Sequence, residues 1–133
     1  MSRKDRTRPA TSKDGDIALK KAQQFMDAAK AEYLNERWDS AGLNAIHSGI
    51  SAADAVVIHA SGLRSASQDH SAVVSLLEKG VSGFRGSPRT QLIGLLKMKN
   101  VVAYEQRLIT KSEAHRLVSA AERFLAWAQT KSN

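Results

Sequence analysis

The residues best suited to chemistry lie where an apolar run meets a polar corner, in LLKMKNVVAYEQ, residues 95–106. Lys99 can neutralise a phosphate as a point charge, and Asn100 beside it offers hydrogen-bond donors and an acceptor. Tyr104 has a reference pKa of about 10 and moves protons poorly near neutral pH, where a histidine would serve. The corner therefore favours binding over catalysis. The alternative is an ordinary helix end, with Asn100 in a turn and Tyr104 packed on the following helix.

A second candidate is the pair Arg64 and His70 in RSASQDH. Arginine can hold a phosphate, and an imidazole titrates near neutral pH, so the two are weak candidates for catalytic residues. The surrounding stretch is polar and follows Gly62. The alternative is therefore a solvated connection in which Asp69 caps a short helix that His70 opens.

A polar strip runs along the helix expected over residues 38–60. Its members are three or four residues apart, which places them on one helix face: Asn44, His47, Ser48, Ser51 and Asp54. Of these, Asn44, His47, Ser51 and Asp54 are candidates to line a pocket for a nucleotide or an RNA base, with Asp54 as a base or as an orienting group for a histidine. The alternative is a set of buried polar groups satisfied by a neighbouring helix or a second copy.

The basic segment is defined as residues 79–111, which contain seven basic side chains and one acidic one. Six residues of this segment are candidates for binding a nucleotide or nucleic acid: Arg85, Arg89, Lys97, Lys99, Asn100 and Tyr104. The glycine-rich GFRG loop can also approach a phosphate backbone closely. The competing interpretation is a solvated face, or one that meets the acidic residues 14–78 of another chain.

Neither a metal nor a cofactor is predicted. The chain has no cysteine, and it lacks the H-x-E and H-E-x-x-H spacings of zinc sites. His47 and His59 are twelve residues apart, which separates them by about 18 Å along a helix. They cannot share a metal ion within one chain.

Composition indicates one globular domain. Of 133 residues, 42% are hydrophobic and 25% charged, the net charge is +7, and five basic residues lie in the first thirteen. We expect a flexible basic tail over residues 1–13 and a single domain over 14–130. The tail has no apolar run of the secretory kind, and polar residues interrupt the apolar stretch 40–63 too often for a membrane span, so a cytoplasmic protein without membrane contact is expected.

The apolar periodicity predicts an all-α, antiparallel bundle of four to five helices. The first expected helix covers 15–36, with Asp14 or Asp16 as its cap, and the second covers 38–60. A short third helix covers 70–79, with Ser67 or Asp69 as its cap. Pro88 opens the fourth helix, which continues through 90–103, and the fifth begins at a capping box of Thr110 and Glu113. No strand of useful length is expected.

The order of these parts resembles the HEPN domain, whose name stands for "higher eukaryotes and prokaryotes nucleotide-binding". The resemblance spans about residues 15–129 and is carried by ERWDSAGLNAIHSGISAADAV and by LKMKNVVAYEQRLITKSEAHRLVSAAERFL, with its strongest part over 95–125. It implies a helical bundle, often a homodimer, that is either a metal-independent ribonuclease, frequently a toxin, or a binding module that accompanies a nucleotidyltransferase.

The ribonucleases of this family carry an R-x4–6-H motif, commonly R-N-x-x-x-H, at the end of the penultimate long helix. Here that place has Lys99 for the arginine, the matching Asn100, and Tyr104 for the histidine. The resemblance therefore implies a nucleotide-, RNA- or partner-binding module without ribonuclease activity, with a nucleotidyltransferase or an antitoxin as its partner. The alternatives are an active ribonuclease that uses Arg64 and His70, and a basic nucleic-acid-binding helical protein.

Overall fold

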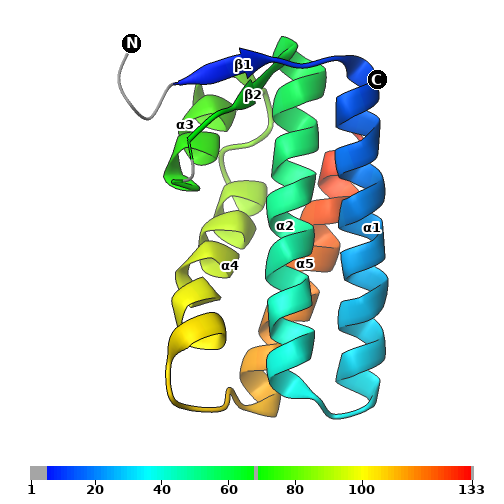
Figure 1. Ribbon diagram of the computed structural model, residues 1–133, viewed down its shortest axis with the longest axis vertical. Coiled ribbons are helices and arrows are strands. Elements are labelled where there is room, and N and C mark those ends of the chain that lie inside the picture. The colour runs from blue at the N-terminus through cyan, green and yellow to red at the C-terminus, as the bar shows by residue number, and fades with distance from the viewer. Residues whose placement is uncertain (1–5, 68, 133) are drawn as a thin grey trace.

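The computed structural model describes residues 6–67 and 69–132, and this part of the chain is a bundle of five helices with a two-stranded ribbon (Figure 1). The elements are β1 (Thr7–Pro9), α1 (Ser12–Leu34), α2 (Trp38–Ser61), β2 (Leu63–Ser65), α3 (Ser71–Gly80), α4 (Ser87–Tyr104) and α5 (Lys111–Gln129). The predicted all-α bundle is confirmed.

Helix α1 begins earlier than predicted. Thr11 is its N-cap: the Thr11 hydroxyl accepts from the Asp14 N–H, and the Asp14 carboxylate accepts from the Thr11 N–H. Asp14 is thus the acidic partner of a capping box, and neither it nor Asp16 is the cap that we predicted. The ordered chain therefore extends into the predicted flexible tail, of which residues 1–5 lie outside the described residues.

The short ribbon was not predicted. Strands β1 and β2 pair antiparallel, with Thr7 opposite Ser65 and Arg8 opposite Arg64. Gly62, at a φ of 69°, turns the chain out of α2 into β2, a backbone conformation that glycine adopts without steric cost. The ribbon lies at the end of the bundle where α1 begins and α2 ends (Figure 1).

Small residues let the other helices approach α2 closely. A Cβ atom at Gly49 would lie 2.6 Å from the Leu95 Cδ1 atom of α4, and one at Gly42 would lie 2.8 Å from the Ile109 Cδ1 atom. The fully buried Ser48 donates its hydroxyl proton to the Ala22 carbonyl of α1 at 2.8 Å. Helix α2 is therefore the central element of the bundle.

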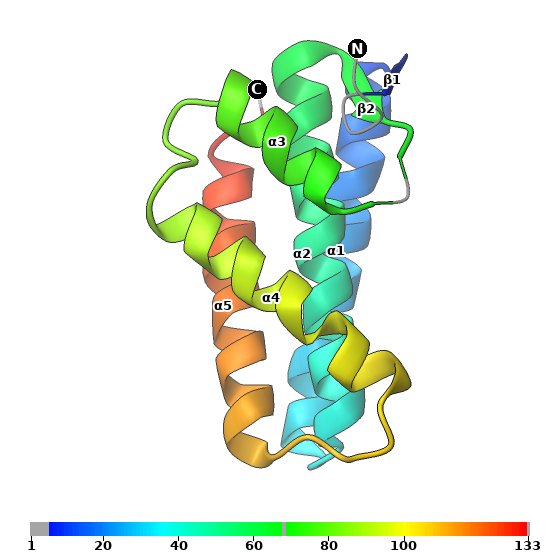
Figure 2. The same ribbon diagram turned by 90° about the vertical axis from the view of Figure 1, so that its left-hand side faces the viewer.

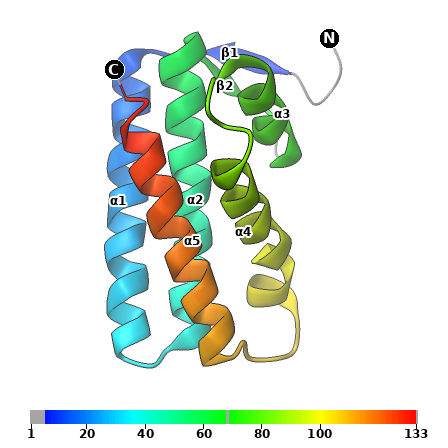
Figure 3. The same cartoon turned by 180° about the vertical axis from the view of Figure 1, so that it is seen from behind.

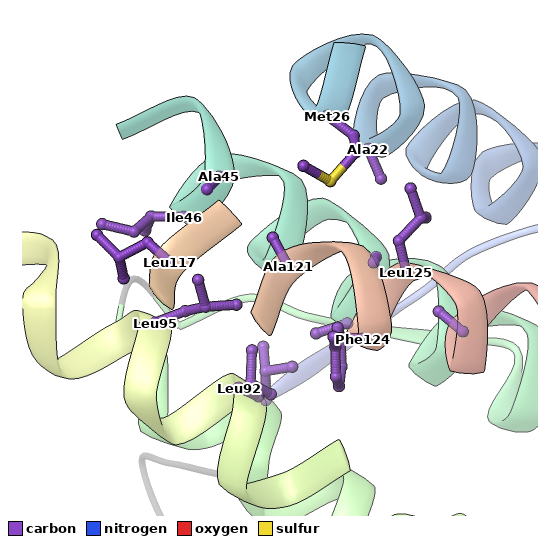
Figure 4. Close-up of a cluster of buried hydrophobic side chains, with 14 of the residues drawn as sticks. Ala22, Met26, Ala45, Ile46, Leu92, Leu95, Leu117, Ala121, Phe124 and Leu125 are labelled. Atoms are coloured by element: carbon purple, nitrogen blue, oxygen red, sulfur yellow. The ribbon is translucent and has the colours of Figure 1, made fainter. Parts of the chain in front are cut away.

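Helix α2 is also long and apolar enough to cross a membrane, but 67% of its apolar stretch is buried within the protein. This burial matches the predicted core helix and is compatible with a soluble protein. The core that encloses it draws on all five helices, and Figure 4 shows its part between α1, α2, α4 and α5. Its labelled side chains are Ala22, Met26, Ala45, Ile46, Leu92, Leu95, Leu117, Ala121, Phe124 and Leu125.

Helices α3 and α4 follow one another on one side of α2, as Figure 2 shows. Figure 3, which views the molecule from behind, shows α5 in front of α2, between α1 and α4. Helix α3 begins after His70, whose side chain makes no capping hydrogen bond. The Asp69 carboxylate caps this end instead, because it accepts from the Ser71 N–H at 2.9 Å, as predicted for Asp69. Helix α4 continues to Tyr104, whose side chain is 73% exposed. The alternative of Asn100 in a turn and Tyr104 packed on the next helix is therefore wrong.

The predicted start of α5 is confirmed. Thr110 and Glu113 form a capping box, and Arg107 donates two hydrogen bonds to the Glu113 carboxylate. The Asp39 carboxylate at the start of α2 accepts from the Ile109 N–H at 2.9 Å. This contact ties the α4–α5 connection to the far end of the α1–α2 hairpin.

Candidate functional site

The α3–α4 pocket is the open pocket formed by the start of α3 and the second half of α4. It has a volume of about 500 Å³ and is lined by Asp69, His70, Ser71, Ile93, Leu96, Lys97, Lys99 and Asn100. Three of the predicted binding residues, Lys97, Lys99 and Asn100, therefore share one pocket. Tyr104 is exposed outside this lining.

An imidazole lies beside Lys99. The distance between the Lys99 Nζ and His70 Nε2 atoms is 3.0 Å. A protonated lysine has no acceptor, so the lysine donates and the Nε2 atom of a neutral imidazole accepts, which leaves the proton of the ring on Nδ1. The pocket thus combines a cation with a neutral imidazole at the entrance of α3.

Two histidines near this point have a lowered pKa. Burial, followed by the charge of Lys99, lowers the pKa of His70, and Asp69 only partly opposes this. Burial and Lys99 also lower the pKa of His47 on α2, whose ring stacks at a tilt 5.5 Å from the Phe25 ring. His47 adds to the lowering of the His70 pKa, so the two imidazoles and Lys99 form one electrostatic cluster.

The predicted pair Arg64 and His70 does not form a joint site. Among the described residues, His70 hydrogen-bonds to Lys99, whereas Arg64 lies over the Asp14 and Asp54 carboxylates in a different pocket. The hydrogen-bond partner of His70 is 29 residues away in the sequence rather than six. The spacing of residues in the sequence could not predict the contact between His70 and Lys99, because this contact depends on how α3 and α4 pack against α2.

The ribbon pocket is a second, separate cavity of about 230 Å³ between α1, α2 and β2. Its polar lining residues are Asp14, Lys21, Ser51, Asp54, Arg64 and Ser65. The predicted polar strip of α2 is therefore divided: Ser51 and Asp54 line this pocket, whereas Asn44 donates to the Ser40 carbonyl and His47 faces the cluster at Lys99. The single pocket of Asn44, His47, Ser51 and Asp54 that we predicted is not formed.

Asp54 is half-buried, and among the described residues no hydrogen bond reaches its carboxylate. Burial raises the pKa of Asp54 to about 6, and the charge of Arg64 opposes this rise only in part. Asp39, the other charged residue of α2, differs because it accepts the Ile109 N–H. The neighbour of Asp54 is thus an arginine rather than the histidine expected from the sequence.

Replacement of Asp54 by asparagine is expected to raise the free energy of unfolding at pH 7.5 by about 1–2 kcal/mol, after allowance for the partial exposure of the group. The unfolded carboxyl group, with a pKa of 3.8, releases its proton more readily than the folded one at about 6. The carboxylate therefore costs stability progressively from pH 3.8 to about 6 and fully above it. Urea unfolding at several pH values measures the difference, which should vanish below pH 3.8; an equal gain at every pH would contradict the burial argument.

The remaining basic candidates lie elsewhere. Arg89 donates to Glu78 at 3.2 Å, and Arg85 lines a separate surface pocket at the loop after α3. The basic segment therefore does not form one surface patch, and of its predicted binding residues Lys97 and Lys99 are the cations at the α3–α4 pocket.

No group of three histidine, aspartate or glutamate side chains within residues 6–67 and 69–132 is arranged to hold a metal ion. His59 is engaged with Asp16, at 2.9 Å between its Nε2 atom and the carboxylate. This contact lies on the α1 side of α2, away from the cluster of His47, His70 and Lys99.

No family model matches the sequence of this chain, and no curated protein matches it significantly.

Proposed function

We propose that the protein is an HEPN-like helical domain that binds RNA or a nucleotide through the α3–α4 pocket. The observation that supports this best is the contact between Lys99 and His70 at the mouth of a pocket that also contains Lys97 and Asn100. Two lysines can neutralise phosphates, and the amide of Asn100 can hydrogen-bond to a base or a ribose. Ile93 and Leu96 add an apolar wall on which the flat face of a base can rest.

The electrostatics of the pocket suit an anionic ligand. A phosphate would accept from Lys99 in place of His70, and the neutral imidazole would then be free to hydrogen-bond to the ligand. Asp69 is the acidic residue in the lining, and its carboxylate is already bonded to the Ser71 N–H. The pocket therefore offers more positive than negative charge to a ligand.

Fluorescence anisotropy with a labelled single-stranded RNA oligonucleotide tests this proposal. Because phosphate contacts release counterions, the logarithm of the association constant should fall linearly as the logarithm of salt concentration rises. Binding that does not respond to salt, or no binding at low salt, would reject RNA as the ligand. A matching titration with nucleoside monophosphates separates RNA from a free nucleotide.

Ribonuclease activity is the second candidate function, and the His70–Lys99 contact favours it. The sequence-based argument against cleavage depended on Tyr104 standing where an imidazole is needed, and His70 supplies a neutral imidazole beside Lys99. His70 would take the proton of a ribose 2′-hydroxyl, whose oxygen would bond to the adjacent phosphorus as the bond from phosphorus to the 5′-oxygen breaks. The 5′-oxygen would leave with a proton from water, and Lys99 would stabilise the charge that develops on the phosphate. Incubation of labelled RNA with the protein in excess EDTA tests this. Intact RNA, or cutting equal to that of the His70→Ala variant, would leave binding as the function.

A binding module of this class would act with another protein. We propose a nucleotidyltransferase or an antitoxin as that partner, and self-association into a homodimer, both on the strength of the HEPN resemblance. Inspection of the neighbouring gene, followed by co-expression and size-exclusion chromatography of the pair, tests the partner. Sedimentation of the isolated chain tests the homodimer.

A further inference from the structure

The ribbon pocket shares no lining residue with the α3–α4 pocket and plays no part in the proposed function. We propose that it binds a small zwitterion of the α-amino-acid class, with the ammonium group at Asp54 and the carboxylate at Arg64 and Lys21. This inference does not depend on RNA or nucleotide binding.

The first observation is that the Asp54 carboxylate accepts no hydrogen bond from a described residue, although the charge of Arg64 acts on it. Asp54 lies on a helix made mostly of small and apolar residues. Burial of a carboxylate that accepts no hydrogen bond is unfavourable, and a ligand that donates to it offsets this cost. An ammonium group would supply three hydrogen-bond donors and would add to the countercharge of Arg64.

The second observation is that the cations on the facing walls form no short ion pair, although the charge of Arg64 acts on Asp14 and Asp54. Lys21 of α1 and Arg64 of β2 line the pocket, and neither makes an ion pair with an N–O distance of 4.0 Å or less within the described residues. Arg8 of β1 lies opposite Arg64 in the ribbon. Two like charges opposite one another in a strand pair are unfavourable, and an anion beside them relieves the repulsion.

The third observation is the balance of charge and size. The lining carries two carboxylates, Asp14 and Asp54, and two cations, Lys21 and Arg64. A ligand with a single charge would leave one wall unmatched, whereas a zwitterion matches both. The volume of about 230 Å³ is below the range typical of drug-sized ligands, which suits a small metabolite.

The lining also predicts a preference among amino acids. Ile17, Ala18 and Ile58 form an apolar wall next to the charged groups. Asp14 is already committed to the capping box of α1, so it does not compete with Asp54 for the ammonium group. A short aliphatic side chain would therefore rest on the apolar wall while the two charged ends reach opposite sides.

Isothermal titration calorimetry with L-leucine, L-valine and L-serine tests the site. At least one of the two aliphatic probes is expected to saturate the protein at one ligand per chain, with a dissociation constant below roughly 1 mM. Asp54→Asn should weaken this binding by roughly tenfold or more, since it removes the countercharge but keeps the shape. Asp27→Asn, on the exposed face of α1, is the matched control and should bind as the unchanged protein does.

Two analogues separate the charged ends of the ligand. N-acetyl-L-leucine lacks the ammonium group and L-leucinamide lacks the carboxylate, so both should bind more weakly than L-leucine. Arg64→Gln should weaken L-leucine but leave the affinity for L-leucinamide nearly unchanged. Affinity for L-leucine should also fall below pH 6, where Asp54 gains a proton. The other charged groups around the pocket are Asp14, Lys21 and Arg64 in its lining and Arg8 opposite Arg64 in the ribbon.

The proposal is overturned if none of the three amino acids binds up to roughly 1 mM. It is also overturned if a probe binds the Asp54→Asn protein as tightly as the unchanged one. Circular dichroism of each variant ensures that a loss of binding is not a loss of folding. Because none of these readouts involves RNA, failure here leaves the α3–α4 pocket unaffected, and failure of RNA binding leaves this site unaffected.

Discussion

Replacing Lys97 and Lys99 together by alanine is expected to weaken the binding of single-stranded RNA more than about tenfold at 0.1 M salt. Both side chains line the α3–α4 pocket, and Lys99 is the donor to His70. Each phosphate contact that is lost removes about 0.7 from the slope of the logarithm of the association constant against the logarithm of salt concentration, so the slope should fall by about 1.4. Anisotropy titrations at several salt concentrations measure both changes.

The matched control removes two lysines from α1, with Lys13→Ala and Lys20→Ala, because Lys30 is paired with Glu122. The total charge falls equally, but α1 lies on the other side of α2 from α4 (Figure 1). If affinity depended only on net charge, the two double variants would bind RNA equally weakly. Equal weakening would therefore contradict a phosphate site at the α3–α4 pocket.

Replacing Leu95 by alanine is expected to lower the free energy of unfolding by roughly 2–5 kcal/mol. Leu95 is 0% exposed, and its Cδ1 atom fills the space above Gly49 between α4 and α2. The substitution removes apolar contacts and leaves a cavity that the glycine cannot fill. Since domains of this size are stable by about 5–15 kcal/mol, the loss is a large part of the total.

Urea unfolding followed by circular dichroism measures this loss, and Leu108→Ala is its matched control. Leu108 is 83% exposed in the connection between α4 and α5, so its truncation should change stability by less than about 0.5 kcal/mol. A small effect at Leu95 would mean that α4 is not packed on α2 as described, and the placement of Lys99 would then be in doubt.

The fold was predictable where its signals are local. The capping box of Thr110 and Glu113 and the apolar stripe behind it predicted α5, because both depend on residues within a few turns. The ribbon could not be found in this way. Each of its strands has three residues, they pair across more than fifty residues of chain, and Arg8 opposite Arg64 is not a favourable cross-strand pair.

The cap of α1 shows how competing local signals mislead. Thr11, Asp14 and Asp16 are all good candidates for a cap, and an acidic residue in the first turn is favourable beside an N-terminus in any case. The structure uses the threonine as the cap and Asp14 as its reciprocal partner. A T-x-x-D pattern was present in the sequence, but it lay in the stretch interpreted as a mobile tail.

The candidate site was predictable only in part. Lys97, Lys99 and Asn100 were found because they follow one another at the end of an apolar helix. The imidazole beside Lys99 was not found, since His70 opens a different helix and meets Lys99 only through the packing of α3 and α4 on α2. The periodic polar strip of α2 failed for the same reason: its members face different neighbours, and Asp54 meets an arginine from the unpredicted ribbon.

The most direct test of the central claim follows the ring signals of the four histidines by NMR while a single-stranded RNA oligonucleotide is added. The α3–α4 pocket predicts that the His70 ring shifts most and in a saturable manner, that His47 shifts less, and that His59 and His115 stay in place. Saturable shifts at His59 or His115 with an unchanged His70 would contradict a ligand site at Lys99.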